Sequence, residues 1–393
     1  MICLSVSRRA ALIAACLPPW AAHAAQPTVE FADDPANTSL MRLATAWRVA
    51  APAAGAPPDR IGVMEIDWAA ARIRVLAEVP VPSRAHGLLA LADGGFVAVA
   101  NRPGRWLLRC DARGQPMQRI DVETERPART FNGHVETSAD GAWFFTTETD
   151  PNTDPLGGHG HISVRDARSL VRVAEFATAG RDPHQLLRAA DGSLLVANGG
   201  IVRDREGRKI DGPLMAPSLV RIAPPAGQVI GQWRLDDPRL SIRHLAWARP
   251  RPATEGPEAP PLLGLALQAE HEREEQRRAA PTLALWDGES LRYATTDAGA
   301  AGYAGDIAAA PDGGFVISAQ KARRGLWWQP ARPERLALVA ELTEPCGLAA
   351  APGGVLISAG RGAARWHESA APAMLPWPVA LAPDNHWVVL RGA

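Results

Sequence analysis

The sequence predicts an all-β fold, a seven-bladed β-propeller, from three observations. A short unit recurs along the chain, in which an apolar strand, an Asp-Gly-like turn and a second apolar strand follow one another. Glycine and proline are frequent, at 35 residues each, and the 13 Trp side chains suit an aromatic core. The two ends of the chain each supply part of one unit. The 393-residue chain is therefore expected to close into a ring.

The repeat is clearest at residues 88–100, where Asp93-Gly94 separates two apolar runs. A third strand ending in Asp and then a fourth strand follow, as in Trp106 to Asp111 and Met117 to Val122. The Asp starts a turn because its carboxylate accepts hydrogen bonds from backbone N–H groups two residues on. Four short strands per unit of about 40–60 residues are typical of propeller blades of the WD40-like kind. Further copies of the first turn stand at Ala139-Asp140-Gly141, Asp191-Gly192, Asp312-Gly313, Pro352-Gly353-Gly354 and Pro383-Asp384-Asn385.

The two chain ends are predicted to share the seventh blade. Residues 60–80 would supply its third and fourth strands and residues 379–390 its first and second, which removes the exposed edge of an open sheet. The domain organisation is then a signal peptide over 1–24, a Pro/Ala-rich lead-in over 25–58 and the propeller over 59–393. The six continuous blades are expected over 84–122, 132–178, 183–236, 242–297, 303–342 and 345–378.

The amino terminus predicts export. Ser7-Arg8-Arg9 precedes an apolar run from Ala10 to Trp20, and Ala22-His23-Ala24 fits a signal-peptidase site, so twin-arginine export to the periplasm is expected. Lipidation at Cys16 is the alternative, although it would leave an unusually short apolar region. No later stretch reaches the ~18 apolar residues of a membrane helix.

The charge balance and the cysteines limit which partners and which covalent links are expected. Lys and Arg number 42, as do Asp and Glu, so electrostatics gives no reason to expect nucleic acid, and a monomer is expected. Once the signal is removed, Cys110 and Cys346 remain, on different predicted strands, as free buried thiols. The charge run from Glu270 to Arg278 predicts a solvated helical turn or loop.

A histidine precedes the first strand in four consecutive blades. First strands line the channel of a propeller, so these imidazoles are expected to converge near its axis, where Asp306 and Cys346 hold the corresponding places of later blades. Imidazole suits transition metals, and iron or copper is the expected ion. The alternative is that each histidine forms a hydrogen bond with the backbone of a neighbouring blade and has only a structural role at the channel mouth. The four are His86, His134, His184 and His244.

Charged residues flank the same level and would either bind a polar ligand or pair with one another. His159 and His161 form a His-x-His pair that either holds a metal weakly or stands exposed in a loop. Asp384-Asn385-His386 is interpreted as a structural turn. The sequence contains none of the familiar catalytic motifs, such as a nucleophile elbow or a phosphate loop. The flanking residues are Arg84, Glu136, Asp182, Arg243 and Glu344.

Several motifs together resemble the exported bacterial family known as domain of unknown function 1513. The resemblance runs from about residue 60 to the end and departs from the family pattern at 158–161 and 270–278. The motifs are His86-Gly87, Asn101-Arg102-Pro103-Gly104-Arg105, Gly133-His134, Thr146-Thr147-Glu148, Asp182-Pro183-His184-Gln185-Leu186, Val196-Ala197-Asn198-Gly199-Gly200-Ile201, Pro217-Ser218-Leu219, Leu240-Ser241-Ile242-Arg243-His244-Leu245, Cys346-Gly347 and Asp384-Asn385-His386.

The resemblance implies a Tat-exported propeller with no established enzymatic activity. Family members are often encoded beside imelysin-type iron-regulated proteins and di-haem peroxidase-like proteins, which implies periplasmic iron-uptake proteins as partners. The first hypothesis is accordingly a metal- or ligand-binding accessory protein in iron acquisition. The alternatives are a metal-dependent hydrolase of the lactonase-like kind, by fold analogy, and a protein-interaction platform that uses the outer loops.

Overall fold

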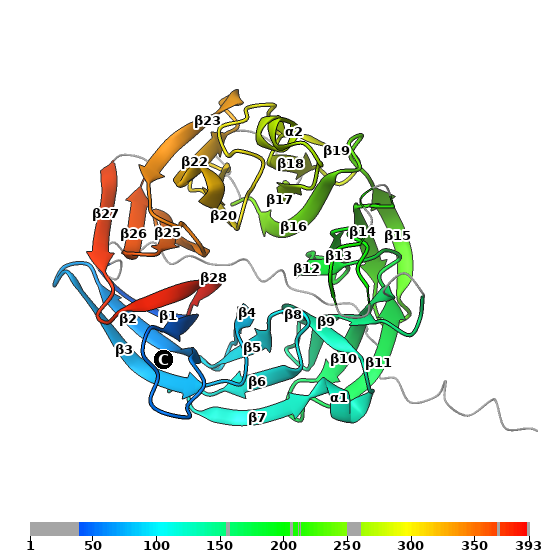
Figure 1. The fold of residues 1–393 in the computed structure, drawn as a ribbon, viewed down its shortest axis with the longest axis horizontal. Coiled ribbons are helices and arrows are strands. Elements are labelled where there is room, and N and C mark those ends of the chain that lie inside the picture. Colours follow the sequence, from blue (N-terminus) through cyan, green and yellow to red (C-terminus); the bar gives the residue numbers. More distant parts are fainter. Residues whose placement is uncertain are drawn as a thin grey trace, which may run out of the picture.

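Seven four-stranded antiparallel sheets surround a central axis (Figure 1). This computed structural model describes residues 39–390 apart from 155–157, 205–206, 211, 213, 250–260 and 368–369. The innermost strand of each sheet contacts the innermost strands of both neighbours all the way round the ring. The predicted seven-bladed β-propeller is therefore confirmed.

Six blades are continuous in the chain, and in each the strands run outward from the axis in sequence order. Their positions agree with the six predicted blades. The first three comprise β4 (Ala85–Ala90), β5 (Phe96–Ala100), β6 (Trp106–Cys110) and β7 (Pro116–Asp121); β8 (Thr130–Thr137), β9 (Trp143–Asp150), β10 (His159–Asp166) and β11 (Arg172–Ala177); and β12 (Pro183–Arg188), β13 (Leu194–Asn198), β14 (Ser218–Ala223) and β15 (Gln228–Trp233). The next three comprise β16 (Leu240–Trp247), β17 (Leu263–Ala269), β18 (Leu283–Trp286) and β19 (Leu291–Tyr293); β20 (Ile307–Ala309), β21 (Phe315–Ala319), β22 (Arg324–Gln329) and β23 (Arg332–Glu341); and β24 (Leu348–Ala351), β25 (Gly354–Ala359), β26 (Gly362–His367) and β27 (Ala370–Pro376).

The closing blade combines both chain ends, as predicted, but with a different division of strands. The carboxyl end supplies only the innermost strand, β28 (Leu381–Val389), and the amino end supplies β1 (Leu40–Val49), β2 (Asp59–Asp67) and β3 (Arg72–Pro80). The lead-in expected over 25–58 therefore contains a blade strand, and the propeller begins by Leu40 rather than at residue 59. Two features concealed β1: a Pro/Ala-rich run over 51–58 follows it directly, and its inner partner β28 lies more than 330 residues away in sequence.

The core lies between adjacent blades and is rich in tryptophan, as expected. Apolar clusters join the facing sheets of neighbouring blades, and the buried tryptophans include Trp106, Trp286 and Trp387. Local turn chemistry connects the strands: the Asp93 carboxylate accepts a hydrogen bond from Gly95 N at 2.9 Å. Short polar turns thus set the strand order, while apolar faces hold the blades together.

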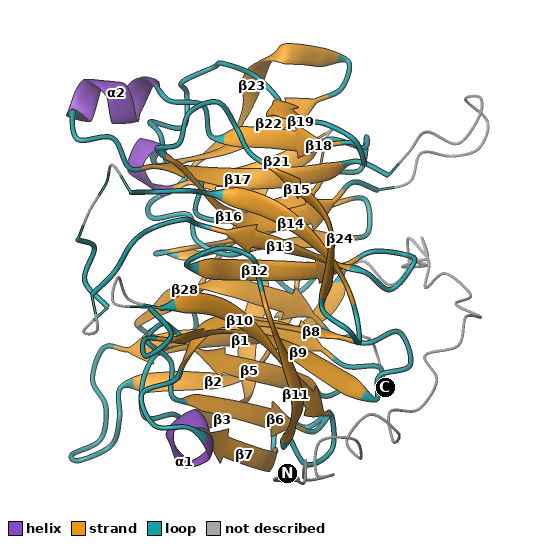
Figure 2. Ribbon diagram, turned by 90° about the vertical axis from the view of Figure 1, so that its right-hand side faces the viewer, coloured by secondary structure: helices purple, strands orange, loops and turns teal. Residues whose placement is uncertain are grey.

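Helical segments are short and lie on one face of the disc (Figure 2). They are α1 (Val122–Glu125), α2 (Glu274–Ala279) and the 3-10 helix Gln320–Ala322. The exposed α2 lies within the charge run predicted to be a solvated turn. Among the described residues, no helix is long and apolar enough to cross a membrane. The predicted signal peptide over 1–24 lies outside the described residues.

Candidate metal centre

Irregular strand pairing marks the innermost strands at one level of the channel. In β4 the pairing shifts between Ala85 and Leu88, so that the His86-Gly87 step contains one residue more than the partner strand. The same kind of shift occurs at the histidine of β8, β12, β16 and β28, whereas β20 and β24 pair regularly. A bulge bends a strand and re-aims its side chains, and bulges are frequent beside functional sites. The five bulged strands each turn an imidazole toward the axis.

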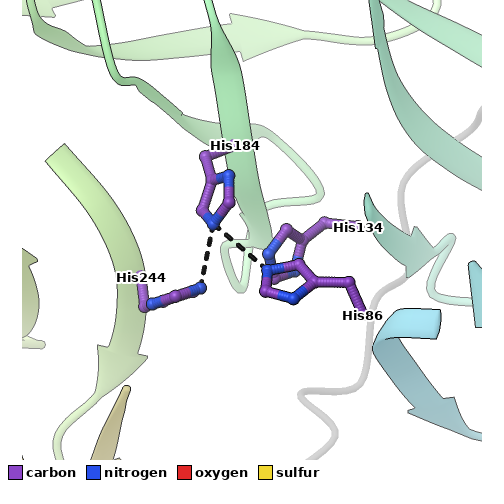
Figure 3. A group of neighbouring side chains, drawn as sticks. All are labelled: His86, His134, His184 and His244. Atoms are coloured by element: carbon purple, nitrogen blue, oxygen red, sulfur yellow. Dashed lines mark hydrogen bonds between the residues drawn. The ribbon is translucent and has the colours of Figure 1, made fainter. Parts of the chain in front are cut away.

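The structure brings the four predicted histidines together (Figure 3). One ring nitrogen from each lies within 4.8 Å of the others, and all four side chains are buried. Their ring centroids are 4.7 to 5.7 Å apart. The four strands that carry them come from four consecutive blades, so the convergence arises from the ring and not from any short sequence spacing.

His386 is a fifth member that the sequence interpretation missed. It lies in the continuous strand β28 and not in a turn, and its Nε2 lies 3.1 Å from His244 Nε2. Local Pro-Asp-Asn composition favoured a turn, but pairing with β1 on either side of this segment, at Pro383 and Trp387, places it inside a strand. The sequence feature that could have identified His386 is its place in the innermost strand of a blade, which it shares with the other four histidines. We call His86, His134, His184, His244 and His386 the histidine cluster.

Two buried aspartates stand behind the cluster. Asp306 Oδ2 lies 3.2 Å from His386 Nδ1 and also accepts a hydrogen bond from Leu348 N at 2.8 Å. Asp384 Oδ1 lies 3.8 Å from His86 Nδ1. A carboxylate hydrogen-bonded to Nδ1 is the usual outer partner of a metal-binding histidine, because it orients the ring and leaves Nε2 free to bind. Asp306 makes this contact, whereas Asp384 lies beyond hydrogen-bond distance of His86. Both Nε2 atoms concerned face other imidazole nitrogens.

The surroundings of four of these imidazoles favour the neutral form. Burial, followed by the neighbouring His386, lowers the pKa of His86 to about 4, against the opposing effect of Asp384. Burial and the adjacent imidazoles hold the pKa values of His134, His184 and His244 well below the usual range for histidine. A neutral imidazole offers a lone pair, which is the form that binds a metal.

The hydrogen bonds among the imidazoles cannot satisfy all of their Nε2 atoms. His184 Nε2 lies 3.3 Å from His86 Nε2 and 3.0 Å from His244 Nε2, and His244 Nε2 also contacts His386. Each nitrogen carries either one proton or one lone pair, so a nitrogen with two nitrogen neighbours cannot make two well-directed hydrogen bonds. The buried Nε2 of His134 has no hydrogen-bond partner among the residues that the structure describes. A cation among these atoms would satisfy their lone pairs.

The spacing also fits a coordination sphere. Two nitrogens bound at about 2.0–2.1 Å to one ion at the tetrahedral angle lie about 3.3–3.4 Å apart, and closer at a right angle. The observed 3.0, 3.1 and 3.3 Å separations fall in that range. These four imidazoles, from His86, His184, His244 and His386, therefore fit a transition-metal ion in both donor type and distance between neighbours, and His134 has a ring nitrogen within 4.8 Å of those of His86, His184 and His244.

The other predicted site residues form ion pairs or local hydrogen bonds. Arg84 pairs with Asp384 at 3.0 Å, and Arg243 pairs with Asp182 at 2.9 Å, so both arginines have a carboxylate partner at the level of the cluster. The Glu136 carboxylate accepts a hydrogen bond from its neighbour Thr137 N at 2.8 Å, and burial raises its pKa. Glu136 is not one of the described residues that line the channel cavity.

Cys346 does not join the histidines, contrary to the prediction. Its Sγ donates to Glu344 O at 3.2 Å, and neither cluster of potential ligands among the described residues includes it. Burial raises the pKa values of Cys346 to about 11 and Cys110 to about 12, so both are neutral thiols. Both are free and buried, as predicted. Cys346 lies two residues before β24 begins, and its backbone N–H donates to Ser358 O at 2.8 Å.

His159 and His161 lie away from the cluster, at the start of β10 rather than in a loop. The exposed His159 ring pairs with Asp154 at 3.1 Å, and His161 Nδ1 contacts His159 O at 3.1 Å. Neither belongs to a group of potential ligands in the described part of the chain. This pair is therefore surface structure.

A cavity of about 420 Å³ adjoins the cluster. His86, His184 and His244 form part of its wall, so an ion held by these residues would have one side facing the cavity. Such an open position is typical of metals that exchange ligands or act on a substrate, whereas closed shells are typical of structural metals. The cavity therefore connects the candidate metal centre to solvent and to small ligands.

Comparison with known proteins supports the family and the fold. A family model described as "Protein of unknown function (DUF1513)" matches residues 79–390 and confirms the resemblance drawn from the motifs. No curated protein matches the sequence. Virginiamycin B lyase from Staphylococcus aureus is similar in structure, with a TM-score of 0.52 and 10% identity, over 75% of this chain and 85% of that chain. The periplasmic gluconolactonase PpgL from Pseudomonas aeruginosa also has a TM-score of 0.52, with 15% identity over 90% and 99% of the two chains. At such identities the similarity shows a shared fold alone.

Proposed function

Since this chain belongs to the DUF1513 family, described as proteins of unknown function, we propose its function from the channel: it binds one first-row transition-metal ion through the histidine cluster. The observation that carries this proposal is the convergence of buried imidazoles whose nitrogens lie 3.0 to 3.3 Å apart. Iron(II) and copper(II) both accept imidazole ligands.

We assign this metal site to iron handling in the periplasm. The twin-arginine motif at Arg8-Arg9 supports export, and the family resemblance supports a place among periplasmic iron-uptake proteins. In this role the protein is an accessory that holds an ion or passes it on, with the open side of the site as the exchange route. Deletion of the gene is expected to slow growth under iron starvation, and unchanged growth and unchanged iron uptake would contradict this assignment.

The direct test is metal retention by the purified full-length protein. The metal-free protein is offered iron(II), copper(II), zinc and manganese in turn, under anaerobic conditions for iron, then desalted and measured by elemental analysis. Retention of one ion per chain is expected for at least iron(II) or copper(II), together with a rise in melting temperature, because an ion that binds only the folded state stabilises it. Retention well below one ion per chain for every metal would overturn the proposal.

A second candidate function is metal-dependent hydrolysis. It is favoured by the cavity beside His86, His184 and His244, because an ion with an open position can bind and activate water. A screen of lactones and esters with and without added metal separates this function from simple binding. Turnover that requires added metal supports an enzyme. If the metal-loaded protein shows no turnover, hydrolysis is excluded and only the binding function stands.

Gly133 provides a test of how the cluster is positioned. Its φ is +100°, and an added Cβ would lie 2.8 Å from His86 Cδ2, so Gly133→Ala is expected to displace the His86 ring and weaken metal binding about tenfold or more. Gly141→Ala is the matched control, because its φ is +70° but nothing lies within 4 Å of its Cβ. Both variants should lose stability, since each forces alanine into a left-handed conformation. Equal metal affinity in the two would contradict a positioning role for Gly133.

A further inference from the structure

The channel cavity has a strongly cationic wall. Six positively charged side chains and one carboxylate, Glu270, line it beside the histidines. They come from separate parts of the ring, including the strand β16, the helix α2 and the 3-10 helix Gln320–Ala322. Net neutrality of the whole chain therefore conceals a local excess of positive charge. The six are Arg102, Arg203, Lys209, Arg243, Arg277 and Lys321.

Three of these guanidinium groups share a single aspartate. Asp182 pairs with Arg102, with Arg203 at 3.3 Å and with Arg243 at 2.9 Å. One carboxylate cannot neutralise three guanidinium groups, so two positive charges remain uncompensated by the ion pairs of the described residues. Asp182 holds this position with a φ of 53°, a left-handed conformation that is uncommon outside glycine and recurs at functional sites.

The Nε of Arg243 is a buried donor without a partner. The Arg243 side chain is 4% exposed, and its Nε makes no hydrogen bond to any residue that the structure describes. Guanidinium groups with unused donors bind carboxylate and phosphate oxygens in a planar, often bidentate geometry.

We propose that this cavity binds a small, multiply charged oxyanion, whose carboxylate or phosphate groups are held by Arg203 and Arg243 and at the rim by Lys321. The volume of about 420 Å³ suits a small molecule. The anion site depends only on the cationic side chains. Contact between the anion and a metal ion rests in addition on the proposed function, and His184 and His244 place that ion at the cavity wall.

The experiment separates the anion from the metal. Metal-free protein, stripped with EDTA and dialysed, is titrated calorimetrically at low ionic strength with inorganic phosphate and with tricarballylate. One saturable site is expected for at least one of the two anions, and their ranking identifies the preferred group. Affinity should fall as salt is added, because exposed charges are screened. Failure of both anions to bind overturns the anion site and leaves metal retention, measured separately, unaffected.

Matched variants locate the site. Arg203→Gln is expected to weaken anion binding about tenfold or more, because a charge-assisted hydrogen bond is lost. The exposed Lys321→Gln, which leaves the buried ion pairs intact, should also weaken binding and tests the proposal if Arg203→Gln fails to fold. The control is Arg119→Gln, because Arg119 is exposed on the outermost strand β7. Wild-type affinity in both Arg203→Gln and Lys321→Gln, or an equal loss in Arg119→Gln, would overturn the assignment.

Discussion

Replacement of His184 and His244 together by alanine is expected to abolish metal retention while the propeller stays folded. These two rings occupy the middle of the chain of Nε2 contacts, each touching two other imidazoles. Loss of an outer partner alone typically reduces metal affinity about 10–100-fold, so removal of two ligands should exceed about a hundredfold. The fold should survive because the apolar cores lie between the blades and include neither residue.

The measurement combines elemental analysis with circular dichroism and thermal melting, each with and without metal. His159→Ala with His367→Ala is the matched control, since it also removes two histidines but leaves the histidine cluster intact. The control should retain one ion per chain and the metal-dependent rise in melting temperature. A His184→Ala/His244→Ala protein that binds metal as tightly as the control would exclude the histidine cluster as the metal site.

Replacement of Glu148 by glutamine is expected to destabilise the protein strongly. This carboxylate is fully buried between two fully buried guanidinium groups, 2.9 Å from Arg165 Nη2 and 2.6 Å from Arg129 Nε. Removal of one partner from a buried ion pair typically costs about 3–5 kcal/mol of unfolding free energy, because the remaining charges are left in a medium of low polarity. Denaturant unfolding measures the loss. Glu125→Gln is the control, since Glu125 pairs with Arg165 from a partly exposed position and should cost about 1 kcal/mol or less.

The same substitution should change the response to acid. Burial alone would raise the pKa of Glu148, but Arg165 and Arg129 outweigh it, and the pKa in the folded protein is lowered. A lowered pKa contributes stability above the unfolded value of about 4.3, and this contribution is lost as the pH falls through the folded pKa. Glu148→Gln should therefore remove part of the stability loss seen in the wild-type protein below about pH 4.3. An identical decline in both proteins would show that the Glu148 ion pairs contribute nothing to acid stability.

The Glu148 network also bears on the candidate metal centre. Glu148 lies on β9, whose neighbour β8 carries His134, and the Thr147 hydroxyl donates to the backbone carbonyl of His184 at 2.8 Å. Asn132 Nδ2 similarly donates to Pro183 O at 2.8 Å. Buried polar contacts thus tie two histidine-bearing strands together just outside the histidine cluster. Buried polar contacts of this kind keep ligand-bearing strands in place when no ion is bound.

Local chemistry made most of the fold predictable from sequence. Asp-Gly turns such as Asp93-Gly94 and the apolar runs beside them are encoded within about ten residues, so blade positions could be derived without tertiary information. The register of these repeats also placed His86, His134, His184 and His244 at one level, because equivalent positions of a closed ring face the same axis.

Tertiary structure decided what depends on distant partners. β1 and β28 form a blade only because they pair with each other across the whole length of the chain, and that pairing turned Asp384-Asn385-His386 from an expected turn into a strand that supplies a fifth imidazole. Asp182 gathers arginines from three separate segments, which no linear spacing reveals. Sequence determined the turns and the repeat because their energetics are local. Side-chain direction at the bulges and the pairing of charges depend on contacts that exist only after the ring has closed.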